Sequence, residues 1–115
     1  MIPPNAAPLM KYLVPLLALL LCACGEPVPP EKSAYVGEWR APAMAILITQ
    51  DGEVRHARKE NGKSKSMKAP LKRFEGDNFV VGLGPVSTIF AVSVAPHEEA
   101  GVWRMTVEGV ELTRK

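Results

Sequence analysis

The last part of the chain carries the pattern that most limits its fold. In residues 101–113, apolar and polar side chains alternate on both sides of the dipeptide Glu108-Gly109. If this dipeptide forms a two-residue turn, Val107 pairs with Val110 and the alternation stays in phase across the turn. A strand repeats every two residues and a helix every 3.6, so the pattern predicts a β-hairpin. Its apolar face, with Trp103 expected as the buried anchor, comprises Trp103, Met105, Val107, Val110 and Leu112.

Turn signals divide the preceding residues into similarly short segments. Asp51-Gly52 and Asn61-Gly62 are typical of hairpins, because Gly tolerates the positive φ of tight turns, and residues 76–78 mark a third turn. After the first 24 residues, no segment combines helical caps with a 3.6-residue repeat. The sequence therefore predicts an all-β fold: a small antiparallel meander, as a barrel or a sandwich, of about 7–9 short strands. The strands expected before the last hairpin are 35–40, 44–50, 53–60, 63–69, 71–75, 79–82 and 87–94, followed by a loop at 95–100.

Two short motifs resemble known families. Gly37-Glu38-Trp39, near the start of the expected meander, resembles the Gly-x-Trp motif of the lipocalin superfamily. This resemblance implies a lipocalin-like barrel whose closed end is plugged by Trp39. The opening Tyr-x-Gly-x-Trp and the ending at residues 105–113 are together similar to small outer-membrane lipoproteins, a likeness that brings no activity with it.

The start of the chain has the layout of a secretory signal. Lys11 precedes an apolar run over residues 12–22, which is 11 residues long. A membrane-spanning helix needs about 20 apolar residues, whereas the apolar core of a signal peptide has roughly 7–15. We therefore expect a cleaved signal peptide at residues 1–23. Met10 is the better initiator, because residues 1–9 contain three prolines and no positive charge.

Leu21-Cys22-Ala23-Cys24 resembles the lipobox of bacterial lipoproteins. The resemblance implies that Cys24 receives a diacylglyceryl thioether, that the peptide before it is removed and that the new amino terminus is acylated. Two acyl chains suffice for stable membrane anchoring. In the sorting pattern of enterobacterial lipoproteins, an Asp after the modified Cys retains the protein in the inner membrane. Because Gly25 follows Cys24 here, we expect a protein of the cell envelope that is anchored in the outer membrane rather than in the inner membrane.

Processing would leave a small domain without spare cysteines. Removing 23 residues from 115 leaves 92, enough for one small domain. Cys22 would be removed with the signal peptide, and the sulfur of Cys24 would carry the lipid. No thiol would then remain for a disulfide, a Cys-based zinc site or a Cys nucleophile. Residues 24–33 are expected to be the lipidated Cys and a Pro-rich, extended linker, and residues 34–115 the all-β domain.

The sequence offers no enzyme signature, cofactor motif or metal site. His56 and His97 belong to unrelated segments, and no motif links either one to a serine. His97-Glu98-Glu99 could supply metal ligands, but a site needs three or four converging groups. Residues 82–85 lack the Lys-Ser/Thr ending of a phosphate loop. We therefore expect a protein that is not an enzyme, with no cofactor and no metal.

One segment is strongly basic. Between Arg55 and Arg73 there are eight basic residues against Glu60 alone, a net charge of +7, which leaves −6 for the rest of the mature chain. The functional hypothesis is an anion-binding face for envelope lipid head groups or acidic glycans. The alternative is a solvated hairpin whose lysines keep an edge strand from aggregating. No aromatic residue interrupts the basic residues before position 74, so nucleic acid is not expected. The candidate residues are Arg55, Arg58, Lys59, Lys63, Lys65, Lys68, Lys72 and Arg73.

Together these features indicate a lipid-anchored, periplasm-facing lipoprotein that acts as a binding or interaction module. Two alternatives stay open: a lipocalin-like carrier of a small apolar ligand, and a periplasmic protein inhibitor of the lysozyme-inhibitor type. The bulky apolar residues are numerous enough to fill a small eight-stranded barrel, which disfavours a carrier. The sequence does not identify a protein partner.

The anchor is directly testable. Cys24→Ser should abolish palmitate labelling and leave an uncleaved or soluble form, because the thiolate is the acceptor of the lipid. Metabolic labelling followed by envelope fractionation measures both effects. Labelling that survives Cys24→Ser but disappears with Cys22→Ala would show that the lipid is on the other cysteine.

Overall fold

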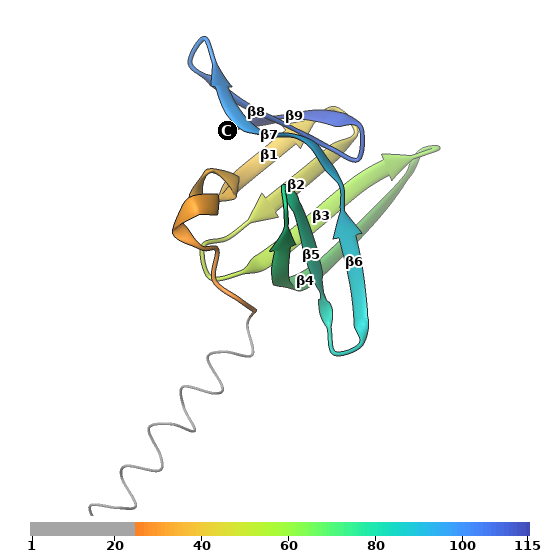
Figure 1. Cartoon of the computed structure of the whole chain (residues 1–115). Coiled ribbons are helices and arrows are strands. Elements are labelled where there is room, and N and C mark those ends of the chain that lie inside the picture. Colours follow the sequence, from red (N-terminus) through yellow and green to blue (C-terminus); the bar gives the residue numbers. More distant parts are fainter. Residues whose placement is uncertain (1–24) are drawn as a thin grey trace, which may run out of the picture.

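The computed structural model describes residues 25–115; the expected signal peptide and Cys24 lie outside the described residues. The described part is a curled antiparallel meander that forms half of a barrel, preceded by one 3₁₀ helix (Figure 1). This confirms the predicted all-β fold. The elements are η1 (Pro30–Tyr35), β1 (Gly37–Ala41), β2 (Met44–Ile48), β3 (Glu53–Glu60), β4 (Lys63–Glu75), β5 (Asn78–Leu83), β6 (Val86–Phe90), β7 (Val92–Glu99), β8 (Val102–Val107) and β9 (Val110–Arg114).

Neighbouring strands follow one another in the sequence except at a single junction. The order in the sheet is β6-β5-β4-β3-β2-β1-β9-β8-β7, so β1 also pairs with β9. The two edge strands, β6 and β7, are consecutive in the chain and are separated only by Ala91. The chain therefore turns a corner at Ala91 between the two edge strands, which share no hydrogen-bonded ladder.

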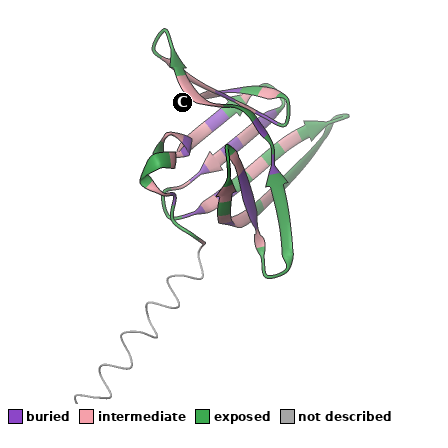
Figure 2. Ribbon diagram, in the orientation of Figure 1, coloured by how far each residue is buried: buried purple, intermediate pink, exposed green. Residues whose placement is uncertain are grey.

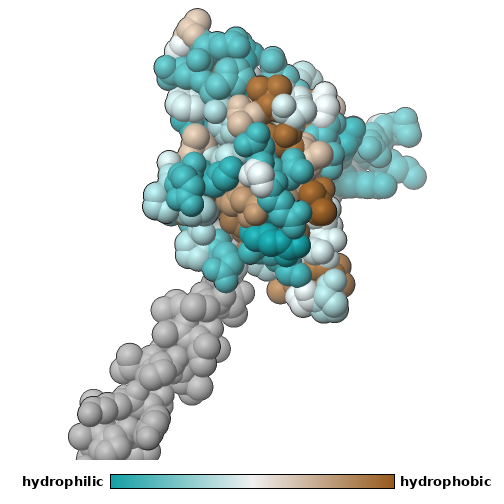
Figure 3. All heavy atoms as spheres, in the orientation of Figure 1, coloured by the Kyte–Doolittle hydropathy of each residue, from teal (hydrophilic) through white to brown (hydrophobic). Residues whose placement is uncertain are grey.

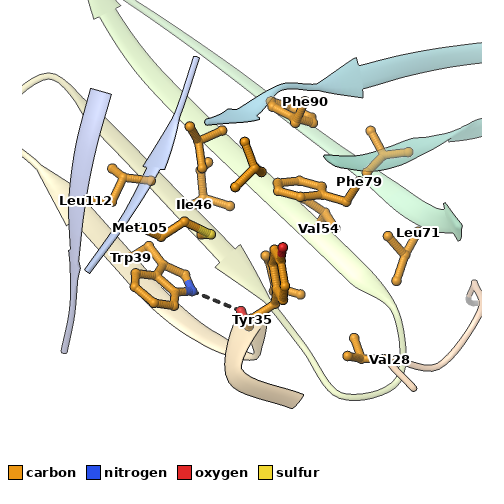
Figure 4. Packing of buried hydrophobic residues seen from close by; sticks show 14 of the residues in the cluster. Val28, Tyr35, Trp39, Ile46, Val54, Leu71, Phe79, Phe90, Met105 and Leu112 are labelled. Carbon is orange, nitrogen blue, oxygen red and sulfur yellow. Dashed lines mark hydrogen bonds between the residues drawn. The ribbon is translucent and has the colours of Figure 1, made fainter. Parts of the chain in front are cut away.

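Apolar side chains from the strands and the N-terminal segment fill the interior. Alternation places these residues on the inner face, and Figure 4 shows them converging. Figure 2 shows that buried residues follow the inside of the curl and that the hairpin tips are exposed. The largest fully buried side chains include Trp39, Phe79, Ile46, Ile48, Leu71, Met105 and Leu112.

The 3₁₀ helix η1 packs against one end of this core through its last residue. The Tyr35 ring lies 4.9 Å from that of Phe74 and 6.4 Å from that of Phe79, measured between centroids. The Tyr35 carbonyl accepts a hydrogen bond from Trp39 Nε1 at 2.9 Å, and the Tyr35 hydroxyl donates to the carbonyl of Asp77 at 2.8 Å. Burial, together with the charge of Asp77, raises the pKa of Tyr35 to about 12. Tyr35 therefore stays neutral and joins β1 to β4 and β5.

The Pro-rich stretch is not the extended linker that the sequence predicts. Val28 is only 2% exposed, and its N–H donates to the carbonyl of Gln50 at 3.0 Å. The N–H of Glu26 donates to the carbonyl of Leu71 at 3.0 Å. The two consecutive prolines at 29–30 suit the entry to η1, because a helix start needs no N–H there. The folded domain thus includes the segment from residue 26, and the first strand begins at Gly37 rather than at position 35.

Three strand boundaries also differ from prediction. Residues 63–75 form one strand, because Pro70 lies where β4 passes from pairing with β3 to pairing with β5. Residues 87–94 are divided at Ala91 by the corner between β6 and β7. The expected loop at 95–100 belongs mostly to β7, whose pairing with β8 contains two irregularities. Each difference depends on which strands pair in the folded sheet, and the local apolar pattern does not specify this.

The last hairpin has the predicted register, with Val107 opposite Val110. Met105 and Leu112 are fully buried, as their shared face requires. Trp103, in contrast, is only partly buried at the margin of the core, and the Arg114 guanidinium covers its ring at 4.7 Å. The prediction that Trp103 is the buried anchor is therefore wrong; Trp39 is the tryptophan with no exposed surface.

The two tryptophans allow a matched stability test. Trp39→Ala should lower the free energy of unfolding by about 3–5 kcal/mol, the usual cost of removing a buried large aromatic side chain. The cost of Trp103→Ala should be lower than that of Trp39→Ala by at least about 1 kcal/mol, because the Trp103 side chain keeps part of its surface in water. Chemical denaturation of both variants measures the difference. Equal costs would show that the two tryptophans contribute equally to the core.

Candidate functional site

The basic segment forms a hairpin that extends beyond the rest of the sheet. Strand β2 pairs with β3 only as far as Arg58, and the N–H of Lys59 donates to the carbonyl of Ala43 at 2.9 Å. Past Lys59, β3 and β4 pair only with each other. All residues from Lys59 to Ser66 are exposed. We call residues 57–66 the basic arm. It protrudes from the barrel in Figure 1, and Figure 3 shows hydrophilic side chains over its surface.

The strand register divides the arm's charges between two faces. Arg55 lies opposite Lys68 on the outer face of the sheet, and Lys59 points to the same side four pairs further on. Arg58 lies opposite Lys65 on the inner face. Residues an odd number apart in a strand point to opposite sides, so this segment has no single basic face.

Carboxylates neutralise part of this charge. Glu53 accepts from Arg55 Nε at 2.7 Å and also lies 3.4 Å from the Lys68 ammonium. This contact with Arg55, and secondarily with Lys68, lowers the pKa of Glu53. Arg58 lies 3.3 Å from Glu60. Among residues 25–115, three arm lysines have no ion-pair partner: Lys59, Lys63 and Lys65.

The last two predicted anion-binding residues lie elsewhere. The Lys72 ammonium donates to the carbonyl of Gly84, and Arg73 pairs with Glu75 at 2.7 Å. Lys72 and Arg73 line a hollow that also contains Gly25, at the base of the β3–β4 hairpin. The eight predicted residues are therefore two separate groups, six in or beside the arm and two near the N-terminal segment.

A shallow trough crosses the outer face of β1–β4 beside the arm. Small side chains, Ala45, Ala57 and Ser66, lie in one cross-strand row and form its floor. Arg55 and Lys68 lie on its rim, and its volume is about 670 Å³. A second hollow, of about 210 Å³, continues it past Arg40, Lys59 and Ser64. Sequence reasoning missed this surface, because its small residues come from three strands and align only in the folded register.

His56 lies on the inner face at the base of the arm. Its ring centroid is 5.1 Å from that of Phe90, and its Nε2 is buried without a hydrogen-bond partner in the described part of the chain. Burial, and then the positive charge of Arg58, lower the pKa of His56. The ring is thus neutral at pH 7 and packs as an aromatic core residue.

The other candidate for chemistry, His97, lies near the tip of the β7–β8 hairpin. Its ring contacts the carbonyl of Ala95 at 3.1 Å and a carboxylate oxygen of Glu99 at 3.0 Å. Both acceptors favour the protonated ring and raise its pKa. Within residues 25–115, no three His, Cys, Asp or Glu side chains gather closely enough to hold a metal ion.

Comparison of the chain with protein-family models, with curated proteins and with solved structures found no match. In the described residues, no helix has the length and apolar character needed to span a bilayer.

The two histidines predict pH effects of opposite sign. The pKa of His56 is below its ordinary 6.5 in the folded protein, so below that pH the unfolded chain binds a proton that the folded chain excludes. The free energy of unfolding then falls. The pKa of His97 is raised, so its protonation in the folded state adds stability as the pH falls through that raised value.

We therefore expect His56→Gln to reduce the loss of stability between about pH 7.5 and pH 5.5, and His97→Gln to increase it. Urea denaturation across this range measures both slopes against the parent protein. A His56→Gln variant with the parent's pH profile would show that this ring titrates alike in the folded and unfolded states.

Proposed function

We propose that the protein is a lipid-anchored, non-enzymatic lipoprotein of the bacterial envelope, whose basic arm and neighbouring trough bind an acidic glycan on the periplasmic side. Attachment through Cys24 rests on the lipobox resemblance. The observation that carries the binding role is the projection of three unpaired lysines beyond the barrel: Lys59, Lys63 and Lys65.

The arm lies far from the N-terminal segment, which favours a glycan as its ligand over the membrane that would hold the protein's own anchor. Glu26 is hydrogen-bonded to Leu71, which adjoins Pro70, and Pro70 lies opposite Glu53 at the base of the hairpin. The tip begins after Glu60, seven residues further along β3. At about 3.3 Å per residue, the arm's tip is roughly 23 Å from Glu53 at the base of the hairpin. Figure 1 shows the arm extending to the side of the barrel away from the first described residues, which are coloured orange.

The trough supplies the shape that an extended chain would need. Its floor of small side chains lets a sugar ring approach the backbone of β2–β4, while Ser64 and Ser66 offer hydroxyl groups. Arg40, Arg55 and Lys68 on its margins supply guanidinium and ammonium groups for acidic substituents. The trough continues onto the outer face of the arm, because Ala57 belongs to both and Lys59 lines the second hollow. Lys63 and Lys65 project from the other face of the same two-stranded arm.

The lipocalin-like carrier has less support. The interior of the barrel is occupied by side chains such as Trp39, Ile46 and Met105, each with no exposed surface. A carrier in the lipocalin manner needs an enclosed apolar space, and the hollows near the arm are open surface features lined by charged residues.

The arm lysines can be tested on the lipid-free form, made with Cys24→Ser. We expect this protein to bind a sulfated polysaccharide and not an uncharged dextran at low salt. Replacing Lys59, Lys63 and Lys65 with Gln should weaken binding by about 3 kcal/mol, roughly a hundredfold, at about 1 kcal/mol for each lysine near an anionic surface. Binding should fall as salt shortens the Debye length from about 10 Å at 0.1 M to 3 Å at 1 M. Isothermal titration at several salt concentrations measures these effects.

A second triple variant controls for net charge. Arg73→Gln, Arg104→Gln and Lys115→Gln remove the same charge from positions outside the arm and the trough, and should leave binding within about threefold of the parent. If both triple variants lose affinity equally, general charge attraction explains the binding. Equal binding of both polymers by the parent would leave the lysines as protection of a solvated hairpin.

A further inference from the structure

The β5–β6 hairpin ends in an exposed apolar tip. Leu83 and Val86 lie directly opposite each other and are 68% and 70% exposed. The turn between them is Gly84-Pro85, in which Gly84 has a φ of +57°. Pro85 has no N–H, so the turn presents one fewer backbone donor that requires water. No Asp, Glu, Lys or Arg occurs from Asn78 to Pro96.

This tip lies beside the residue that follows the proposed lipid attachment site. Gly25 and residues 82–84 line the same hollow, of about 330 Å³. The hydrogen bond from Lys72 to the carbonyl of Gly84 ties the turn to β4. The charged residues around the hollow are Glu26, Lys72 and Arg73, with a net charge of +1. Figure 1 shows the hairpin tip and the first described residues, coloured orange, at the same end of the molecule.

We propose that the tip of the β5–β6 hairpin inserts into the surface of the bilayer to which Cys24 is anchored. This inference rests on the proposed lipid attachment at Cys24. An anchor at Cys24 would hold Gly25 at the membrane, and the neighbouring Leu83 and Val86 then face the bilayer. Their aliphatic side chains leave water there, while Lys72 and Arg73 lie at the level of the lipid phosphates.

The hairpin has the features of a membrane contact rather than those of a protected edge. Exposed edge strands usually carry lysines, prolines or bulges that discourage pairing. Strand β6 has an unbroken pairing with β5 and contains only Val, Ser, Thr, Ile and Phe, and its residues 86–89 are exposed (Figure 2). Figure 3 shows hydrophobic residues together with polar ones at the lower right of the molecule, where this hairpin ends. A second copy of the chain pairing along β6 is the competing occupant, which the experiment separates.

The test uses the lipidated protein in vesicles of phosphatidylethanolamine and phosphatidylglycerol. A polarity-sensitive fluorophore is attached to a cysteine introduced by Val86→Cys, and in a matched variant to one introduced by Ser64→Cys at the exposed arm. We expect the probe at position 86 to be quenched by nitroxide-bearing lipids and protected several-fold from aqueous iodide. The probe at position 64 should show the reverse. Adding Leu83→Asp to the Val86→Cys protein should return its probe to water, because a carboxylate is strongly disfavoured in hydrocarbon.

Each other result overturns the inference in a distinguishable way. A position-86 probe as open to iodide as the position-64 probe would show that the hairpin remains in water. Protection from iodide without quenching by lipid nitroxide would assign the tip to contact with a second copy. The parent protein, treated with the same thiol dye, reports on the anchor: labelling of the parent would show an unacylated Cys24, and both the proposed function and the inference would fail. If the parent is unlabelled and stays with the vesicles, the anchor at Cys24 is in place, and an exposed probe at position 86 then overturns only the proposed insertion of the hairpin.

Discussion

The packing of Trp39 beneath η1 is the contact on which the rest of the structure depends. Trp39 is fully buried, and its Nε1 donates to the carbonyl of Tyr35, whose ring packs against Phe74 and Phe79 on the far side of the barrel. Residues 25–115 contain no cysteine, so this packing and its hydrogen bond hold the two halves of the described domain together without a disulfide. Since η1 makes this junction, the segment before it is also fixed, and Gly25 is held beside Leu71. The same interaction therefore stabilises the core and determines which end of the barrel would face the membrane.

An open barrel leaves two edges, and the chain treats them differently. At the corner, the N–H of Val92 donates to the Asn78 side chain, and the N–H of Glu108 donates to the carbonyl of Ala91. Strand β7 carries Pro96, two acidic residues and an irregular pairing, all of which discourage a further strand from adding to it. Strand β6 has none of these features. The contrast agrees with the proposed contact between the β5–β6 hairpin and a lipid surface, because only the β6 edge lacks features that discourage strand pairing.

The sequence was sufficient for features that depend on near neighbours. The turn at Glu108-Gly109 and the opposition of Val107 and Val110 follow from local alternation, and the structure confirms them. The docking of residues 26–28 could not be predicted, because the hydrogen-bond partners of Glu26 and Val28, at Leu71 and Gln50, come together only in the folded sheet. The division of the basic residues was partly readable: Arg55 and Arg58 are three positions apart, so one strand must place them on opposite faces. Their ion pairs with Glu53 and Glu60 follow from the same two-residue spacing along β3.

The arm lysines and the pair Lys72 and Arg73 are far enough apart for salt to screen each group from the other. At physiological ionic strength the Debye length is about 8 Å, whereas the arm's tip is roughly 23 Å along β3 from Glu53 at the base of the hairpin. Lys72 and Arg73 therefore add little to the potential at Lys63, and the reverse also holds. The +7 charge of the linear segment overstates what a partner at either end would encounter. In the proposed orientation, the pair beside Gly25 faces lipid phosphates while the three unpaired arm lysines face the periplasm. A chain with a net charge near zero can then hold two different anionic surfaces apart, because rigid strands rather than charge set the distance between them.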